Sequence, residues 1–330
     1  MIKLQIMKTN IFILLFVLVT GVFVGCEDQT TPETLNVQKP YTYSDLYYKN
    51  LRDYKESDHS IAFGWFADYT QHHSLAIRFM GLPDSLDICS LWGGIPSLKK
   101  NDPVTFYDSI AYKEMRFVRD VKGIKMVVPT IIRIANFPQF TKDSVGVNAF
   151  GDYLVNMVLD NDLDGADLDY EPEGDYLTGT PMSWLIKHMG EKLGPKSSNP
   201  DKLLIIDFYG QQPPQDTEPY VNYFVRQAYN ASSDNYLSVP SGIPNRKYVV
   251  TENIGDNWQN GGVAYTQYSG NTLSIDGNRL YSLEGMARWV PKTGGRKGGF
   301  GAFYMHRDYN LDPPYKTMRK AIQAQNPAIY

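Results

Sequence analysis

The sequence predicts an α/β protein built as a single (β/α)8 barrel. Eight short runs rich in Ile, Val, Phe and Tyr have the length and composition of β-strands, and turn residues bound them. Amphipathic helical patterns lie between several of these runs, and alternating strands and helices form parallel βαβ units. Beyond residue 41 the chain shows no linker and no internal repeat, so its length fits one barrel better than two small domains.

The elements follow one another in the order that a barrel requires. Strands are predicted at Ser60–Trp65, Ser85–Leu91, Lys125–Thr130, Gly165–Tyr170, Lys202–Phe208, Tyr223–Tyr229, Lys247–Thr251 and Gly299–Met305. Helices are predicted at Ser109–Val121, at residues 150–158, from a cap at Ser183 to Met189, at Leu283–Val290 and at Tyr315–Gln323. No helical pattern follows the fifth and sixth strands, so we expect irregular connections there. An open doubly wound sheet is the alternative, but no glycine-rich phosphate loop follows any strand.

The N-terminus resembles a bacterial lipoprotein signal. Two lysines precede an apolar run from Ile11 to Val24, which is shorter than the ~20 residues of a membrane-spanning helix. Cys26 directly follows Gly25, as in a lipobox, and we expect Cys26 to be lipidated. The acids after it resemble the surface-export signal of Bacteroidota lipoproteins. A simple signal peptide cleaved nearby is the alternative.

These features divide the chain into three parts. We expect a signal peptide at residues 1–25, a flexible tether at 26–41 and the barrel domain at 42–330. The protein would then be an outer-membrane lipoprotein exposed at the cell surface. Its N-terminal lipid would be its only attachment to the membrane.

The composition disfavours several partners. The formal net charge is −4, and a mildly acidic chain does not favour nucleic acid or an anionic membrane surface. If Cys26 carries a lipid, Cys89 is the remaining cysteine, and its apolar neighbours indicate a buried structural thiol. The five histidines show no metal-ligand spacing, so we expect neither a metal nor a cofactor. We expect a monomer.

Residues 164–171 read Asp-Gly-Ala-Asp-Leu-Asp-Tyr-Glu and place four acids in an otherwise apolar segment. Alternate side chains of a strand share a face, so Asp167, Asp169 and Glu171 would line one face and the leucine and tyrosine between them the other. Crowded buried carboxyl groups drive their pKa values apart, which suits a site with one proton donor and one permanent anion. A solvated acidic turn or a loose cation site is the alternative.

In a barrel, this acidic segment is the fourth strand. Active sites of such barrels lie at the C-terminal ends of the strands. Glu171 falls at that end, Asp169 and Asp167 lie successively deeper, and Pro172 stops the strand. Position and chemistry therefore indicate the same active site.

The acidic segment resembles the D-G-x-D-x-D-x-E signature of glycoside hydrolase family 18, complete in all four acids. Members of that family are (β/α)8 barrels that cleave β-1,4 bonds following an N-acetylglucosamine. The resemblance implies that Glu171 is the general acid and that Asp169 orients the substrate acetamide and stabilises an oxazolinium intermediate. It also implies that Asp167 holds Asp169 and shares its proton, while Asp164 is structural. The acetamide oxygen is then the nucleophile, an exception to the usual two-carboxylate scheme.

A second match lies at the end of the sixth strand, where Gln227 and Tyr229 fit a Gln-x-Tyr pattern. Family 18 chitinases usually carry Met-x-Tyr-Asp there, whereas the endo-β-N-acetylglucosaminidase branch often has Gln-x-Tyr. The resemblance implies that Tyr229 hydrogen-bonds the acetamide carbonyl and that Gln227 contacts the −1 sugar. The alternative is that both are ordinary polar residues at a strand end.

Two departures from the chitinase pattern favour the same branch. The eighth strand lacks the tryptophan that commonly forms the floor of the −1 subsite, and the segment between Thr251 and Gly299 is too short for the α+β insertion of many chitinases. We therefore expect a retaining endo-β-N-acetylglucosaminidase that acts on N-linked glycans or glycoproteins. A chitinase or related hexosaminidase, and a catalytically silent glycan-binding lipoprotein, are the alternatives.

Aromatic rings give sugars an apolar platform with a polar handle. Trp65 ends the first strand, Trp92 follows the second and Trp258 follows the seventh, so we expect all three on the rim of the site. Asn253 and Tyr304 are further candidates for contact with substrate. For each tryptophan, packing in the core or in a lid is the alternative.

Overall fold

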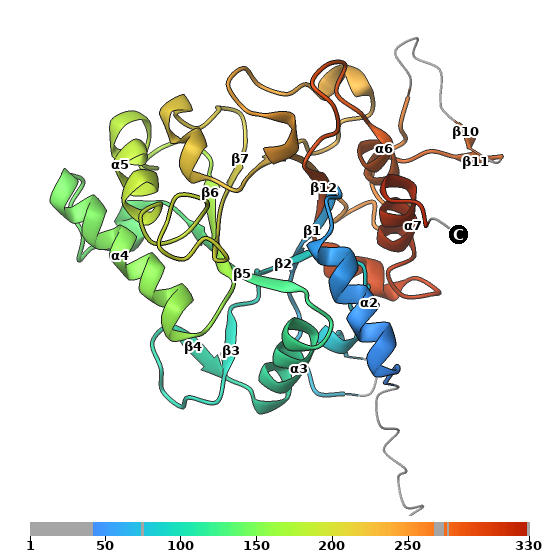
Figure 1. Ribbon diagram of the computed structural model, residues 1–330, viewed down its shortest axis with the longest axis horizontal. Helices are drawn as coiled ribbons and strands as arrows, with labels where there is room; N and C mark the ends of the chain where they lie inside the picture. The colour runs from blue at the N-terminus through green and yellow to red at the C-terminus, as the bar shows by residue number, and fades with distance from the viewer. Residues whose placement is uncertain (1–41, 74–75, 267–273, 276, 329–330) are drawn as a thin grey trace, which may run out of the picture. The chain divides into compact units, whose positions relative to one another are not determined.

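Eight parallel strands close into a barrel, and helices surround it (Figure 1). The strands lie in the order β1, β2, β5, β6, β7, β8, β9 and β12, so each pairs with the next barrel strand along the chain. The predicted (β/α)8 fold is confirmed. The computed structural model describes residues 42–73, 76–266, 274–275 and 277–328. The predicted signal segment, the tether and Cys26 lie outside the described residues.

All eight predicted strands are present in the barrel. They are β1 Ile61–Phe66, β2 Ile88–Leu91, β5 Lys125–Ile131, β6 Gly165–Tyr170, β7 Leu203–Phe208, β8 Tyr223–Gln227, β9 Tyr248–Asn253 and β12 Gly299–Phe303. The last strand ends two residues earlier than predicted because Tyr304 adopts a left-handed backbone with φ 57°, which ends the extended chain. The sixth strand is also shorter, since the chain turns after Gln227 and Asn230 is left-handed.

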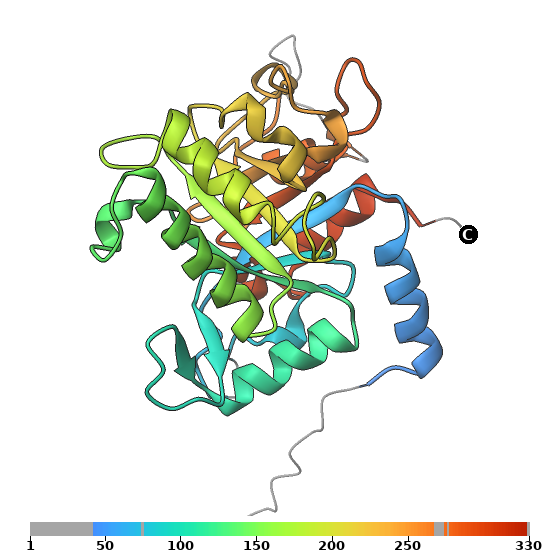
Figure 2. The same cartoon turned by 60° about the vertical axis from the view of Figure 1, so that its left-hand side comes forward.

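The α-helices lie outside the barrel. They are α2 Asp45–Glu56, α3 Ser109–Asp120, α4 Ser144–Asp160, α5 Gly179–Met189, α6 Ser282–Arg288 and α7 Lys316–Gln325. Side chains of Ser44, Asp108 and Asp143 accept backbone N–H bonds at the starts of α2, α3 and α4. Helices α4 and α5 pack side by side next to β6 (Figure 2). Within the described residues, no helix is both long enough and apolar enough to span a membrane.

As predicted, the connections after the fifth and sixth barrel strands are irregular. The described residues there contain only short 3-10 turns: η4 Gln215–Tyr220 after β7, and η5 Asp234–Tyr236 and η6 Asn245–Lys247 after β8. Proline lacks the backbone N–H of a helical hydrogen bond, and Pro219 lies inside η4 while Pro244 precedes η6. Further 3-10 turns are η2 Phe79–Gly81, η3 Ile134–Asn136 and η7 Met305–Asn310.

The predicted helix cap at Ser183 is wrong. Helix α5 begins at Gly179, and Pro181 fits its first turn because backbone N–H groups there have no partner within the helix. Ser183 lies inside the helix, and its hydroxyl donates to Asp216 Oδ1 at 2.8 Å. This bond ties α5 to η4.

Several small elements were not predicted from the sequence. Helix α2 precedes the first strand, and two pairs of short strands lie in loops outside the barrel. These are the parallel pair β3 Ile95–Ser97 and β4 Thr105–Tyr107, and the antiparallel pair β10 Ser274–Ile275 and β11 Asn278–Arg279. Strands of two or three residues are too short for periodicity to identify them.

The buried side chains form two layers separated by the barrel wall. On β1, Phe63 and Trp65 belong to the inner layer, whereas Ala62 and Phe66 belong to the outer layer under the helices. Buried members of the inner layer are Ile61, Phe63, Trp65, Ile88, Val127, Ile205, Val225 and Val249. The inner layer fills the barrel, and the candidate site is built upon it.

Candidate active site

The acidic strand β6 presents its carboxyl groups to the barrel interior. Asp167 and Asp169 bond to side chains of other barrel strands, whereas Leu168 and Tyr170 are fully buried in the outer layer. The predicted alternation of the strand is therefore confirmed. Strand register sets Asp169 beside Asp207 of β7.

The start of the acidic strand is fixed by contacts to its neighbours. Asp164 Oδ2 accepts bonds from the Met126 backbone N–H and from Arg119 Nε, both at 2.8 Å. A Cβ on Gly165 would lie 2.3 Å from the Leu203 carbonyl oxygen, so only glycine lets β6 approach β7 this closely. Asp164 and Gly165 thus fix the strand register that directs the side chains of Asp167 and Asp169 into the barrel.

Asp167 is the deepest acid of the strand and is fully buried. Its Oδ2 accepts hydrogen bonds from Trp65 Nε1 at 3.0 Å and from Ser90 Oγ at 2.8 Å. Burial nevertheless raises the pKa of Asp167, because desolvation outweighs these bonds. Its Oδ1 has no N–H or O–H donor among the described residues.

Asp169 lies nearer the mouth of the barrel and is 5% exposed. Its Oδ1 accepts a hydrogen bond from Gln227 Nε2 at 3.1 Å. Burial raises the pKa of Asp169, and the nearby charges of Glu171 and Asp167 raise it further. Asp169 can therefore exchange between a protonated and an ionised form near neutral pH.

Asp207 is a third buried acid in this cluster and was not predicted from the sequence. It is 1% exposed, and its Oδ1 accepts a bond from Gln227 Nε2 at 2.6 Å. Burial raises the pKa of Asp207 well above its usual range, and the charges of Asp167 and Asp169 add to the shift. A single acid inside the apolar run Leu203–Phe208 was the signal in the sequence.

Glu171 directly follows β6 and is half-buried at the mouth of the barrel. It lies near enough to Asp169 and Tyr229 for its charge to raise their pKa values. Among the described residues, the Glu171 side chain forms no hydrogen bond or ion pair. Its carboxyl group is therefore available to a ligand.

An aromatic platform lies beside the acids and consists of Trp92, Tyr209, Tyr229 and Phe303. Phe303 stacks on Tyr229 with centroids 5.9 Å apart and meets Trp92 edge-on at 5.3 Å. Tyr209 also stacks on Tyr229 at 6.5 Å and is 55% exposed. Burial and the neighbouring carboxylates raise the pKa of Tyr229 well above its usual range, so its phenol remains a hydrogen-bond donor. Tyr209 and Phe303 were not predicted from the sequence.

Of the three tryptophans expected on the rim, only Trp92 belongs to this platform. Trp65 lies inside the barrel at 2% exposure, because its N–H bonds to Asp167 and its ring packs against Phe63. Trp258 packs half-buried against the outer core layer, since the chain turns sharply after β9. The expectation of a rim position is thus corrected for Trp65, and the structure does not bring Trp258 to the platform.

The other candidate residues have structural contacts. Gln227 is 6% exposed, and its amide N–H groups bond to the carboxyls of Asp169 and Asp207. Asn253 Oδ1 accepts the Gly255 N–H at 2.9 Å and so shapes the turn after β9. The Tyr304 ring adjoins Phe303 at 4.2 Å, at the edge of the platform.

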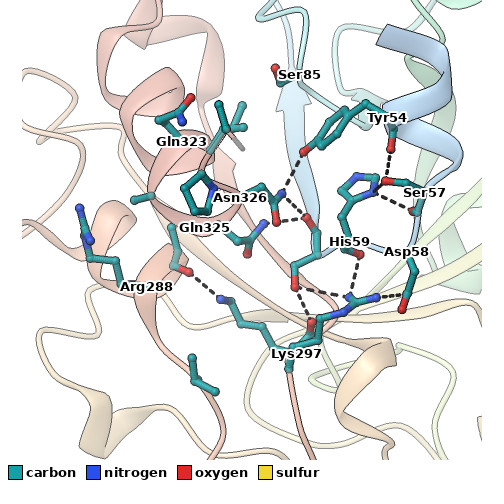
Figure 3. Close-up of a pocket in the computed structure, with 18 of the residues that line it drawn as sticks. Tyr54, Ser57, Asp58, His59, Ser85, Arg288, Lys297, Gln323, Gln325 and Asn326 are labelled. Atoms are coloured by element: carbon teal, nitrogen blue, oxygen red, sulfur yellow. Dashed lines mark hydrogen bonds and ion pairs between the residues drawn. The ribbon is translucent and has the colours of Figure 1, made fainter. Parts of the chain in front are cut away.

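A cavity of about 970 Å³ opens at the opposite end of the barrel, where β1 begins (Figure 3). Its polar groups bond to one another. Asn326 Nδ2 donates to the Tyr54 hydroxyl at 3.0 Å, and Lys297 Nζ donates to the carbonyls of Ala287 and Trp289 at 2.7 and 2.8 Å. The acids and aromatic rings at the C-terminal mouth therefore make the better candidate site.

The mouth combines the parts that glycoside hydrolysis needs. Glu171 is a carboxyl group at the mouth whose side chain has no bonding partner among the described residues, Asp169 is a second carboxyl behind it, and Tyr229 offers a phenol donor. Within the part of the chain that the structure describes, no three His, Cys, Asp or Glu side chains are placed to hold a metal ion.

A (β/α)8 barrel with such an acidic mouth has the architecture of a glycoside hydrolase. A family model described as glycoside hydrolase family 18, BT1044-like, matches residues 26–324. The chain belongs to this family and is a glycoside hydrolase.

Individual relatives agree with the family assignment. The chain is 24% identical over 323 residues to endo-β-N-acetylglucosaminidase F2 of Elizabethkingia meningoseptica, which covers 90% of this chain and 91% of the relative. A solved structure of BT1044 has a TM-score of 0.70 at 24% identity and covers 86% of this chain and 93% of that one. The endo-β-N-acetylglucosaminidase of Cordyceps militaris has a TM-score of 0.65 at 23% identity, with coverage of 87% and 98%. These structural matches show that the barrel fold is shared.

Proposed function

We propose that this family 18 hydrolase is an endo-β-N-acetylglucosaminidase that cuts the β-1,4 bond between the two core N-acetylglucosamines of N-linked glycans. The observation that carries the proposal is the free carboxyl of Glu171 beside Asp169 and Tyr229 at the barrel mouth. The names of the Elizabethkingia and Cordyceps relatives support the activity. A double mutant of the Cordyceps enzyme has also been solved in complex with fucosyl-N-acetylglucosamine-Asn, which supports an N-glycan substrate.

The reaction follows from the positions of the acids. Glu171 protonates the departing glycosidic oxygen while the 2-acetamido oxygen of the substrate attacks the anomeric carbon. Asp169 accepts the acetamide N–H and stabilises the positive charge of the oxazolinium intermediate. Tyr229 donates to the acetamide oxygen and holds it in line, and Asp167 supports Asp169 from below. Water then opens the intermediate with Glu171 as base, so the product retains its configuration.

The aromatic platform supplies the sugar contacts. Trp92 and Tyr209 are 37% and 55% exposed, and their ring faces suit the apolar C–H faces of sugars. Between β9 and β12, the described residues form only α6 and the short strands β10 and β11. An open mouth of this kind suits a branched glycan better than a long linear polymer.

Glycan-release profiling tests the proposal against its alternatives. The protein is incubated with a panel of N-glycosylated proteins and, separately, with chitooligosaccharides. Release of glycans that leave one N-acetylglucosamine on asparagine supports the proposal, whereas shortened chitooligomers alone would indicate a chitinase or hexosaminidase. Binding without any product would indicate a silent glycan-binding protein, an outcome that the presence of Glu171 argues against.

We propose further that residues 1–25 are a signal peptide and 26–41 a tether that joins lipidated Cys26 to a monomeric barrel at residues 42–330, on the outer face of the outer membrane. The basic start, the short apolar run and the position of Cys26 support this arrangement. Metabolic labelling with a fatty-acid analogue tests it, since Cys26→Ala should abolish the label. Protease treatment of intact cells tests surface exposure, and light scattering of the purified barrel tests the monomer.

A further inference from the structure

Asp207 is enclosed by the acid cluster on the inner side of the barrel. Its strand is hydrogen-bonded to β6, and the register sets it beside Asp169. One nitrogen, Gln227 Nε2, donates to Asp207 Oδ1 at 2.6 Å and to Asp169 Oδ1 at 3.1 Å. At 1% exposure, Asp207 has no access to bulk water that could stabilise a negative charge.

The cluster contains three carboxyl groups, and no Lys, Arg or His among the described residues forms an ion pair with any of them. The groups that interact with it are the neutral donors Trp65 and Ser90, the amide of Gln227, the phenols of Tyr229 and Tyr176, and the acid Glu171. Among the described residues, neither Asp167 nor Asp169 nor Asp207 takes part in an ion pair. Three adjacent buried carboxylates cannot all be ionised at once, so the cluster must retain at least one proton.

The hydrogen bonds indicate where that proton lies. Asp207 Oδ2 and Asp167 Oδ1 are buried oxygens without an N–H or O–H donor among the described residues. Asp207 lies on the same inward face as both other acids, directly beside Asp169 in the register and diagonal to Asp167, and the pKa values of the three groups respond to side-chain hydrogen bonding among them. The Asp167 anion already has two donors, whereas Asp207 has only one. A proton on Asp207 Oδ2 therefore gives both orphaned oxygens a partner in one O–H···O bond.

We infer that Asp207 is a positioning residue that stays protonated through turnover and donates its O–H to Asp167. No bond forms or breaks at Asp207, and its proton is not transferred to the substrate. Because Asp207 donates its hydrogen bond to Asp167, the carboxylate of Asp169 can accept the N–H of the substrate acetamide. The proton that is transferred to the leaving group then remains on Glu171. This inference rests on the proposed hydrolase function.

Two substitutions of Asp207 test whether this residue is protonated or ionised in the active enzyme. Asp207→Asn has the same charge as a protonated aspartate, and its amide can donate to Asp167 while its carbonyl accepts from Gln227. We expect its kcat to remain within about threefold of wild type and both limbs of its pH–rate profile to stay in place. Asp207→Leu removes the donor, so kcat should fall about 10- to 100-fold with little change in KM, and the pH profile should shift. Circular dichroism and thermal melting check that both variants fold.

Two outcomes would overturn the inference. If Asp207 were ionised, Asp207→Asn would remove a negative charge beside Asp169 and shift the alkaline limb to lower pH. Full activity of Asp207→Leu would show that the residue does not position the cluster.

Infrared spectroscopy tests the proton without requiring turnover. The difference spectrum between wild type and Asp207→Asn at pH 7 should contain the C=O band of a protonated carboxyl group. If it shows a carboxylate band instead, the inference is wrong even for an active hydrolase. If the carboxyl band is present but no substrate is cleaved, the proposed function fails while the protonation state stands.

Discussion

The indole Nε1 of Trp65 donates to Asp167 Oδ2 at 3.0 Å inside the barrel, across a sequence separation of 102 residues. The bond joins the first barrel strand to the acidic strand beneath the mouth of the barrel. It gives the deepest carboxyl a neutral donor where water cannot reach. The tryptophan that the sequence suggested as a sugar platform therefore supports the acid cluster from below.

Removing this donor should weaken both the fold and the site. Trp65→Phe keeps an aromatic ring but leaves Asp167 Oδ2 with Ser90 as its remaining side-chain donor among the described residues. We expect a loss of about 1–3 kcal/mol in the free energy of unfolding, because a buried acceptor loses its partner. Urea denaturation at pH 7 measures it, with Trp92→Phe as a control on the exposed platform. Equal stability of the two variants would contradict this role of Trp65.

The phenol of Tyr229 should act mainly in the transition state. Tyr229→Phe keeps the stack on Phe303 but removes the hydroxyl that we propose donates to the acetamide oxygen. By analogy with other donors to a reacting oxygen, kcat should fall by about 10²-fold while glycan affinity changes little. Steady-state kinetics and calorimetric binding measure the two effects. The matched control is Tyr209→Phe, whose hydroxyl has no catalytic role here, and a similar loss in both variants would argue against the assignment.

Glu252 makes the stability of the barrel depend on pH. It is fully buried on β9, and its Oε1 accepts the backbone N–H groups of Asn230 and Asn253, both at 2.7 Å. Burial raises the pKa of Glu252 to about 7. Because its folded-state pKa lies above the unfolded value, its contribution to stability is present below about pH 4.5 and is lost as pH rises through about 7. The loss amounts to about 3 kcal/mol.

Glu252→Gln keeps the acceptor oxygen but cannot ionise. We therefore expect this variant to gain stability relative to wild type as the pH rises from about 5 to about 8. Urea denaturation at both pH values gives the comparison. An unchanged difference between variant and wild type across this range would show that Glu252 does not titrate as its burial implies.

Much of the fold could be predicted because each barrel strand is an apolar run of its own. The acidic strand could also be predicted from the sequence, because Asp167 and Asp169 alternate with Leu168 and Tyr170 at the period of a strand. The role of Asp207 could not be predicted in the same way, because a single acid in an apolar run forms no periodic pattern. Its meaning appears only when strand register sets it beside Asp169.

The positions of the aromatic rings at the mouth of the barrel could not be predicted from the sequence either. Trp65 and Phe303 each lie near the end of a barrel strand and on its inner face, and their rings are in contact. Trp65 is nevertheless buried, whereas Phe303 is partly exposed. The order of residues along the strands could not say which ring would reach the mouth. That depends on the stagger of neighbouring strands and on the loops that follow them.

The most direct test of the account is the turnover of Glu171→Gln on an N-glycosylated protein that the wild type deglycosylates. The variant keeps the size of the side chain but has no proton to give the departing sugar. Mass spectrometry should show a glycan loss that leaves one N-acetylglucosamine on asparagine for wild type, and no loss for the variant, which calorimetry should still find bound to the glycan. Glycan release by Glu171→Gln at a rate near that of wild type would contradict the central claim that Glu171 is the catalytic acid.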